Sequence, residues 1–432
     1  MARNLKFPLK KDENASETGA ETETEIERGL PMITVNPYGV RQADLIVGIP
    51  SYNEADNIGF VVEQSNKGLL QYFPGLKTVV INVDNHSPDN TREAFLNSAN
   101  TVPKIYISTP ENVKGKGNNF YNLFRAAVNL RARAVVVVDA DLMSITPEWI
   151  RDLARPILEE GYDFASPLYS RNEYDGTITN NICYPLLVGL LGKEMRQPIG
   201  GDFAFSQRLA RYYLERPWHK TTRQYGIDIF MSLNALFGGF KVCQVGLGAK
   251  IHKPSAPKLG PMFTQVVSTL FETLLAYRPQ WENVRRVEPL PLFGTDRLAK
   301  PQSLSIDYKS MKTTALYEFN MNRDILKRCL TAENYYRLEQ MYDSGKLNIG
   351  VNLWGKIVYD LLYAYDTTDA NSHLVEAMKS LYFGRVVSFI KQTLDLDHEQ
   401  SEEQICKQAR YFFRMRQYLL QKYRRGDRVA LN

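Results

Sequence analysis

Val135-Val-Val-Val-Asp139-Ala-Asp141 is the most informative stretch of this sequence. Four consecutive valines are typical of a β-strand that is buried on both faces, as the strands of parallel sheets are. Asp139 and Asp141 are two residues apart, so their carboxylates project to the same side of an extended chain. Parallel sheets bind ligands beyond the carboxyl ends of their strands, where such a pair can hold a divalent cation and its phosphates. The alternative is an Asp-rich turn that binds nothing.

The sequence before this stretch alternates between short apolar strands and amphipathic helices. Polar turns follow these strands: Glu54 lies in the first turn, Asp84 opens the second, and Gly115-Lys116-Gly117 lies in the third. The two glycines let the backbone approach a ligand while Lys116 presents one cation. The alternation predicts an α/β fold with a mostly parallel, Rossmann-like sheet and helices on both faces. The upstream strands are expected at 44–50, 77–83 and 104–108.

Composition divides the 432 residues into four parts. Residues 1–38 are polar and rich in Glu and Thr, which predicts a disordered tail, with folding starting near Gly39. An α/β catalytic domain at 39–282 is followed at 283–302 by a proline-punctuated linker. An all-α C-terminal domain at 303–432 is predicted because apolar residues recur there at helical spacing. Its helices are expected at 306–319, 323–344, 350–365, 371–394 and 402–423.

The predicted helical domain is rich in aromatic side chains, among them Tyr336, Trp354 and Tyr359. Packing against the α/β domain or against a second subunit explains these side chains better than stacking on a ligand does. A homodimer through the helical region is therefore one expectation.

Charge and composition exclude several classes of function. A net charge of +5 is small for this length and gives no case for nucleic acid, which usually needs a clustered basic patch. The four cysteines have neither metal-ligand nor redox spacing, so reduced thiols in a cytoplasmic protein are expected. No apolar run reaches the length of a membrane span, and the chain opens without a signal peptide.

Several motifs, taken in order, resemble a known family. Ile49-Pro-Ser-Tyr-Asn-Glu54, Asp84 with Asp89, Gly115-Lys-Gly117 and Asp139-Ala-Asp141 are similar to the motifs of GT-A glycosyltransferases. Downstream motifs resemble the glucosyl-3-phosphoglycerate synthases and the mannosylglycerate synthases, which are retaining enzymes. The downstream motifs are Gln197-Pro-Ile-Gly-Gly-Asp202, Tyr225-Gly-Ile-Asp228 and Gly248-Ala-Lys-Ile-His252.

The resemblance implies a catalytic carboxylate and three binding sets. Asp228 would be the catalytic carboxylate and would orient the acceptor hydroxyl. Asp141 and His252 would bind a divalent metal, Mn²⁺ or Mg²⁺, and a histidine ligand favours Mn²⁺. The nucleotide sugar would contact Pro50, Glu54, Asp84, Lys116, Asp139 and Ala140. The acceptor would contact Arg171, Thr179, Gly200, Gly201 and Asp228.

Simpler structural roles stay open for four of these residues. Asp84 could cap its turn, and Arg171 could be a solvated loop cation. Asp228 could serve the dipole of the helix that it opens. His252 could be a core histidine, although it lies just past a strand and close to Lys250.

The resemblance implies a hexosyltransferase that moves glucose or mannose from a UDP- or GDP-hexose to the 2-hydroxyl of D-glycerate, which makes a compatible solute. A glucosyl-3-phosphoglycerate synthase is the first alternative. The Gly-Arg-Val-Thr loop of those enzymes corresponds here to Gly176-Thr-Ile-Thr179, and the missing arginine favours free glycerate. Two further alternatives are an inverting GT-A transferase that acts on a polysaccharide or lipid with Asp202 as base, and a non-catalytic nucleotide-sugar binder.

Overall fold

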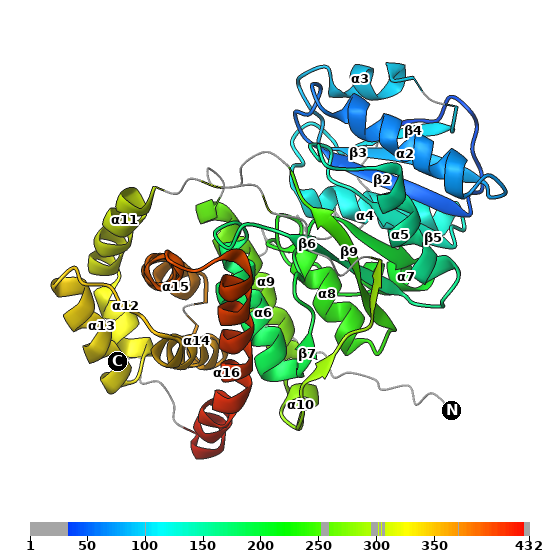
Figure 1. Cartoon of the computed structure of the whole chain (residues 1–432). Helices are drawn as coiled ribbons and strands as arrows, with labels where there is room; N and C mark the ends of the chain where they lie inside the picture. The colour runs from blue at the N-terminus through cyan, green and yellow to red at the C-terminus, as the bar shows by residue number, and fades with distance from the viewer. Residues whose placement is uncertain are drawn as a thin grey trace, which may run out of the picture.

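The computed structural model describes residues 33–99, 101–251, 259–294, 301, 304, 307–369 and 371–426, except for the side chains of residues 371 and 372. The first half forms an α/β domain and the second half is helical, as predicted (Figure 1). The main sheet of the described residues has nine strands in the order β1-β4-β3-β2-β5-β8-β6-β9-β11. These are β1 (Ile33–Val35), β2 (Leu45–Ser51), β3 (Thr78–Asp84), β4 (Lys104–Ser108), β5 (Ala134–Val137), β6 (Phe164–Ser170), β8 (Phe203–Ser206), β9 (Val242–Ala249) and β11 (Leu292–Gly294).

β5 lies at the centre of the sheet, and its valines alternate between the two faces. Val135 and Val137 belong to the hydrophobic cluster on one face, whereas Val136 belongs to the cluster on the other. β5 pairs in parallel with β2, which pairs in parallel with β3. The predicted buried strand is confirmed, and Asp139 and Asp141 lie just beyond its carboxyl end.

Helices cover both faces of the sheet because each presents one apolar side to it. On one face, Val61 of α2 and Trp149 of α5 are buried against the strands. On the other, Phe124 of α4 packs against Tyr213 of α7, with ring centroids 5.1 Å apart. The bounds are α2 (Ile58–Tyr72), α3 (Thr91–Asn97), α4 (Lys116–Asn129), α5 (Pro147–Leu158), α7 (Gln207–Leu214) and α8 (Ile227–Phe237).

Three predictions about this domain are wrong in part. The disordered tail was placed at 1–38, but Ile33–Val35 form β1, which pairs antiparallel with β4; residues 1–32 lie outside the described part of the chain. β8 was not predicted, and it runs antiparallel between β5 and β6. The linker at 283–302 is more than a connection, because β11 extends the sheet beside β9 and β10 (Glu288–Pro289) pairs with β7 (Lys193–Glu194).

The helical half differs from its prediction at two places. The helix expected at 323–344 is two helices, because α12 ends where Leu330 adopts an extended conformation. α9 was not predicted, and it lies in the part of the chain that was assigned to the α/β domain. The helices are α9 (Leu259–Ala276), α10 (Arg278–Trp281), α11 (Tyr308–Met321), α12 (Arg323–Cys329), α13 (Ala332–Asp343), α14 (Val351–Thr367), α15 (Asn371–Thr393) and α16 (His398–Arg425).

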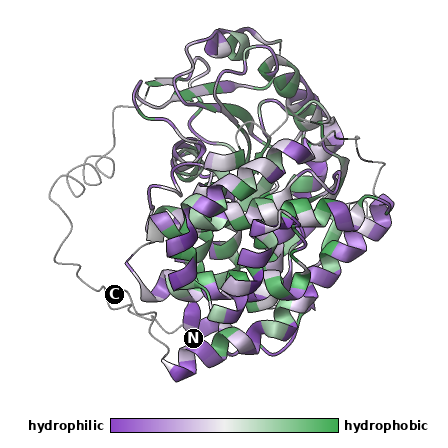
Figure 2. Cartoon of the chain, turned by 90° about the vertical axis from the view of Figure 1, so that its left-hand side faces the viewer, coloured by the Kyte–Doolittle hydropathy of each residue, from purple (hydrophilic) through white to green (hydrophobic). Residues whose placement is uncertain are grey.

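The helical half packs onto the α/β domain through a shared hydrophobic core. Seen from its outer side, the helices of this half carry hydrophobic and hydrophilic stretches in alternation (Figure 2). α16 lies against a helical segment made of η1 (Thr179–Cys183), α6 (Tyr184–Leu186) and η2 (Leu187–Leu191). The indole of Trp354 donates a 2.7 Å hydrogen bond across this junction to the carbonyl of Asn181. Trp354 and Tyr359 are fully buried, which confirms core packing for them, whereas Tyr336 is exposed.

All four cysteines are free thiols, as the spacing of the cysteines in the sequence predicts. Burial raises the pKa of Cys243 to about 12 and that of Cys329 to about 11, so neither is a reactive nucleophile. Within the described ranges, no helix is both long enough and apolar enough to cross a membrane.

Candidate active site

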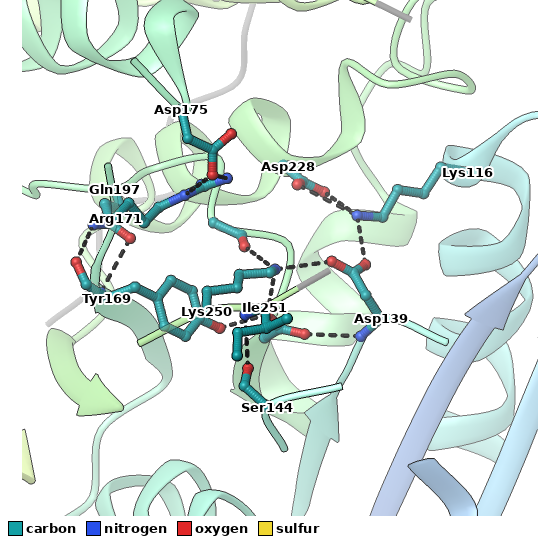
Figure 3. Close-up of polar contacts among 12 residues, drawn as sticks. Lys116, Asp139, Ser144, Tyr169, Arg171, Asp175, Gln197, Asp228, Lys250 and Ile251 are labelled. Atoms are coloured by element: carbon teal, nitrogen blue, oxygen red, sulfur yellow. Dashed lines mark hydrogen bonds and ion pairs between the residues drawn. The ribbon is translucent and has the colours of Figure 1, made fainter. Parts of the chain in front are cut away.

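Lys116 joins two of the predicted carboxylates beyond the end of β5. Its Nζ lies 3.1 Å from Asp139 Oδ1 and 3.4 Å from Asp228 Oδ1 (Figure 3). The three side chains come from the first residue of α4, the turn after β5 and the first turn of α8. The fold thus brings together predicted donor-site and acceptor-site residues that are up to 112 positions apart.

The charges of this cluster stabilise one another. Burial alone would lower the pKa of Lys116, but the carboxylates of Asp139 and Asp228 outweigh burial and raise it. Burial opposes ionisation of Asp139, yet Lys116 and Lys250 hold the pKa of Asp139 well below its usual range. Burial raises the pKa of Asp228 even though Lys116 opposes this shift. Cations in such a desolvated site can stabilise a diphosphate leaving group.

Lys250 belongs to this cluster, although no sequence motif assigned it a role. Its Nζ donates to Asp202 Oδ2 (2.6 Å), to the carbonyl of Gly200 (2.8 Å) and to Asp139 Oδ2 (3.0 Å). Asp202 is fully buried, and its other oxygen accepts the backbone amide of Asp139 at 2.8 Å. The Tyr169 hydroxyl also donates to Asp202. The sequence did contain one signal for these contacts, a lysine at the end of a buried strand. Such a lysine predicts a carboxylate partner, because lysine is rarely buried without one.

The predicted glycines are fitted closely to this cluster. Gly201 has a φ of 91°, and a Cβ there would lie 2.3 Å from Asp139 Oδ2. A Cβ at Gly200 would lie 2.3 Å from Cγ of Pro167. The turn therefore requires glycine at both positions, and direct contact of Gly200 and Gly201 with an acceptor remains a prediction.

Asp84 shapes the turn that follows β3. Its carboxylate accepts hydrogen bonds from the hydroxyls of Ser51 (2.7 Å) and Tyr106 (2.9 Å). The amide and hydroxyl of Ser87 donate to it at 2.8 and 2.7 Å. Asp84 is 1% exposed, so these four contacts support the turn-capping alternative.

The other predicted nucleotide-sugar residues lie near the same edge of the sheet. Pro50 is the penultimate residue of β2 and pairs with Val83 of β3. Glu54 follows in the next turn, where its Oε2 accepts a 3.0 Å hydrogen bond from Asn57. Ala140 is buried between the two aspartates of the Asp-x-Asp motif. This placement agrees with their predicted roles, which remain predictions.

The predicted metal ligands are described only in part. Among the described residues, no three His, Cys, Asp or Glu side chains gather into a metal site, and His252 lies outside the described residues. Ile251, the last described residue before His252, bonds to the loop after Asp141. Its amide donates to Ser144 Oγ at 3.0 Å (Figure 3). Its carbonyl accepts from the amide of Met143 at 2.9 Å. Mg²⁺ in nucleotide enzymes usually takes one or two carboxylates plus substrate phosphates, so Asp141 at this position fits such a cation.

Arg171 and Thr179, the predicted acceptor residues, lie on either side of Gly176. A Cβ at Gly176 would be 3.6 Å from Arg171 Nη1 and 3.8 Å from Thr179 Oγ1. Arg171 forms an ion pair with Asp175 at 2.8 Å. Thr179 Oγ1 is buried and has no hydrogen-bond partner among the described residues. A guanidinium and an unsatisfied hydroxyl around one glycine are suited to binding a carboxylate.

A small cavity of about 10 Å³ lies beside Arg171 and Thr179, and Arg196 from the α/β half and Glu402 from the helical half also line it. Arg196 donates to Glu402 through Nη2 (2.7 Å) and Nε (3.0 Å), which makes a bidentate pair. Nothing in the sequence connects Glu402 with this cavity, because the contact depends on how α16 packs against the α/β domain.

The chain is similar to known glycosyltransferases. Residues 46–215 match the family model described as glycosyl transferase family 2. The matched segment is similar to that family; it includes Lys116, Asp139 and Arg171 and ends before Asp228 and Lys250. No curated protein matches the chain.

Several solved structures are also similar. One is glucosyl-3-phosphoglycerate synthase from Mycobacterium tuberculosis in complex with Mn²⁺, UDP and phosphoglyceric acid, at 25% identity over 54% of this chain and 78% of that chain, with a TM-score of 0.44. The same enzyme with Mg²⁺ and UDP gives 25% identity over 54% and 79%, also with a TM-score of 0.44. A mycobacterial protein without a stated function gives 26% over 54% and 74%, with a TM-score of 0.43.

Proposed function

We propose that this protein is a retaining hexosyltransferase that moves glucose or mannose from a nucleotide diphosphate sugar to the 2-hydroxyl of D-glycerate. The glycosyltransferase sequence over residues 46–215 supports the reaction class. The observation that carries the proposal is the position of Lys116 between Asp139 and Asp228. One cation then joins the strand end that would receive the donor to the helix that would receive the acceptor.

On this proposal, the donor binds beyond the ends of β2, β3 and β5. Lys116 would contact the diphosphate, and Asp139 would contact the ribose. The nucleoside would be held by Pro50, Glu54 and Ala140, and Asp84 would shape the turn beside them through its contacts with Ser51 and Ser87. A Mn²⁺ or Mg²⁺ ion bound by Asp141 and His252 would supply Lewis-acid stabilisation of the diphosphate.

Asp228 would orient the attacking hydroxyl of the acceptor. The bond between the anomeric carbon and the β-phosphate oxygen breaks as the bond from that carbon to the acceptor oxygen forms. The hydroxyl proton passes to the departing phosphate oxygen on the same face of the sugar. Lys116 lies 3.4 Å from Asp228. The carboxylate that would orient the acceptor and the cation that would stabilise the leaving group therefore share one side of the site.

The inverting alternative, with Asp202 as base, is less well supported. Asp202 already accepts hydrogen bonds from Lys250, Tyr169 and the amide of Asp139, and it is fully buried. A general base must reach the proton that it removes, and these contacts direct both oxygens of Asp202 toward the protein. Asp202 is better suited to positioning Lys250 and the Asp-x-Asp turn.

The acceptor would bind at the cavity beside Arg171, which would have to widen from about 10 Å³ to admit it. Arg171 and Thr179 would bind the carboxylate of glycerate, which directs its 2-hydroxyl toward Asp228. An acceptor phosphate would need a further cation, and the loop position that supplies it in the phosphoglycerate-using enzymes is Thr177 here. We therefore favour free glycerate over 3-phosphoglycerate.

A transfer assay tests the proposal. The protein is incubated with UDP-glucose, GDP-glucose or GDP-mannose, together with D-glycerate, 3-phosphoglycerate or no acceptor. We expect transfer to D-glycerate and an α-linked product in its NMR spectrum. A β-linkage would reject the retaining mechanism, and absence of transfer to either acid from all three donors would reject the proposed acceptor class.

A further inference from the structure

The acceptor cavity is balanced in charge. Among the described residues that line it, the charged side chains are Arg171, Arg196, Asp175 and Glu402, which are two cations and two anions. Each arginine is paired with one of the carboxylates, at 2.8 Å for Arg171 with Asp175 and 2.7 Å for Arg196 with Glu402. An anionic group that enters the cavity therefore meets cations that already have anionic partners.

The Arg196–Glu402 pair is held firmly. Arg196 Nε donates to Oε2 of Glu402 at 3.0 Å, and Nη2 donates to Oε1 at 2.7 Å. The guanidinium also lies 5.3 Å from the ring centroid of Tyr184. The two side chains are only 12% and 23% exposed. Burial favours the neutral form of Glu402, but Arg196 outweighs it and keeps the pKa of Glu402 below its usual range. Glu402 is thus an anion fixed in the cavity wall.

The helical half of the chain supplies this anion. Glu402 lies in the first turns of α16, which packs against the segment that contains Thr179. Gln408, farther along the same helix, donates a 2.8 Å hydrogen bond to the carbonyl of Asn180, the residue after Thr179. The position of Glu402 relative to Thr179 is therefore fixed by polar contacts as well as by packing.

We propose that Glu402 is a specificity-determining residue, which selects acceptors with one anionic group and excludes those with a second, such as a phosphate. The proposal rests on the proposed function and deepens it. A carboxylate beside Arg171 would share the guanidinium with Asp175, but it would gain the unsatisfied hydroxyl of Thr179 as a further partner. A phosphate at the Arg196 end would have to displace Glu402 from the guanidinium or lie beside a like charge. A neutral hydroxyl there can instead donate a hydrogen bond to Glu402.

The test compares Glu402→Gln with a matched control, Glu403→Gln. Glutamine keeps the size of residue 402 and an oxygen that can accept from Arg196, but it removes the negative charge. Glu403 is the next residue on α16; it is 62% exposed and pairs with Lys407. The ratio of kcat/KM for 3-phosphoglycerate to kcat/KM for D-glycerate is measured for the parent and both variants with the same donor.

We expect the parent to favour D-glycerate. Glu402→Gln should raise the 3-phosphoglycerate to glycerate ratio by about tenfold or more, since a charge-assisted contact becomes available to the phosphate. Glu403→Gln should leave the ratio unchanged. A parent that prefers 3-phosphoglycerate, an unchanged ratio in Glu402→Gln, or an equal rise in both variants would overturn the proposal. The parent ratio is a test even if the Glu402 variant fails to fold.

Calorimetric binding separates this inference from the proposed function, because it needs no turnover. 3-Phosphoglycerate should bind Glu402→Gln about tenfold more tightly than the parent, while D-glycerate binding changes little. If neither acid is glycosylated but this affinity change appears, the proposed reaction fails and the role of Glu402 in the cavity stands. If transfer to glycerate occurs but 3-phosphoglycerate binds the parent and the variant equally, the reaction stands and the role of Glu402 is wrong.

Discussion

The Nζ atom of Lys250 lies 2.6 Å from Oδ2 of Asp202, and neither side chain is more than 3% exposed. Asp202 also accepts the backbone amide of Asp139, so this ion pair ties the turn at 200–202 to the end of β5. A buried pair of this kind stabilises the fold only while both partners are present. The pair therefore fixes where the Asp-x-Asp motif begins.

Lys250→Met should destabilise the protein by about 3–5 kcal/mol, because Asp202 is left as a buried charge without its cation. Adding Asp202→Asn in the same chain should recover part of that loss, since the uncompensated charge is removed. Thermal unfolding of the two variants measures both effects. Lys67→Met is the control: Lys67 is 52% exposed in an i,i+4 pair with Glu63, and its loss should cost under about 1 kcal/mol. Equal losses from Lys250→Met and Lys67→Met would contradict the assignment.

Gly201→Ala should abolish most activity. A Cβ at this position would lie 2.3 Å from Asp139 Oδ2, so the carboxylate must move away from Lys116 and Lys250. Gly239→Ala is a matched control, because Gly239 also has a positive φ, 71°, but has open space around its missing Cβ. Both variants should lose about 1 kcal/mol of stability from the backbone conformation. Only Gly201→Ala should also lose transfer activity; similar activities would show that the position of Asp139 is unimportant.

Asp228→Asn should lower kcat by about 10²- to 10⁴-fold while the protein stays folded, because the carboxylate proposed to orient the acceptor is lost. The competing role for Asp228 is to stabilise the helix dipole. Asp324→Asn tests that role, because Asp324 is an acidic residue in the first turn of α12. If Asp228 serves only the dipole, the two variants should show comparable small shifts in Tm and unchanged turnover.

Removal of divalent cations with EDTA should abolish transfer, and Mn²⁺, Co²⁺ or Mg²⁺ should restore it. Asp141→Ala and His252→Ala should each lose most activity without a large change in Tm. Calorimetry of Mn²⁺ in the presence of UDP should show weaker binding to both variants than to the parent. A His252→Ala variant as active as the parent would remove His252 from the metal site.

The Arg196–Glu402 pair should make stability depend on pH. Because the pKa of Glu402 is lower in the folded protein than its usual value, the pair contributes stability above about pH 4.3. That contribution is lost as the pH falls through the folded-state pKa. The difference in Tm between the parent and Glu402→Gln should therefore be largest near neutral pH and shrink below about pH 4. A difference that is constant between pH 7 and pH 3.5 would show that the charge of Glu402 contributes nothing.

Local patterns predicted the centre of the fold well. The run of valines at 135–138 identifies a strand that is buried on both faces. This signal lies in consecutive residues, so it needs no knowledge of distant segments. The proximity of Lys116 and Asp139 could also be predicted. Both residues follow strands of one parallel sheet, and the turns after such strands meet at one edge.

Contacts between distant segments were beyond these patterns. Lys250 reaches Asp139 across 111 positions, and Arg196 reaches Glu402 across 206. Each pair forms because separate elements pack together. Lys250 lies in the Gly248–His252 motif and Arg196 just before the Gln197–Asp202 motif, but neither motif marks the partner. β8 was missed for a related reason, since Phe203–Ser206 gain their strand partners only when the chain returns between β5 and β6.

The pairing of Lys116 with two carboxylates affects how quickly a ligand can leave this site. Asp139 and Asp228 are anions tethered to the same chain, and each lies within 3.4 Å of Lys116 Nζ. A phosphate that binds Lys116 exchanges with these carboxylates and does not meet an unpaired cation. As a phosphate departs, the carboxylates are already in place at high effective concentration to receive the lysine. On the proposed function, this arrangement would lower the affinity for the nucleotide and speed its release, because the protein carries its own competitor for the cation.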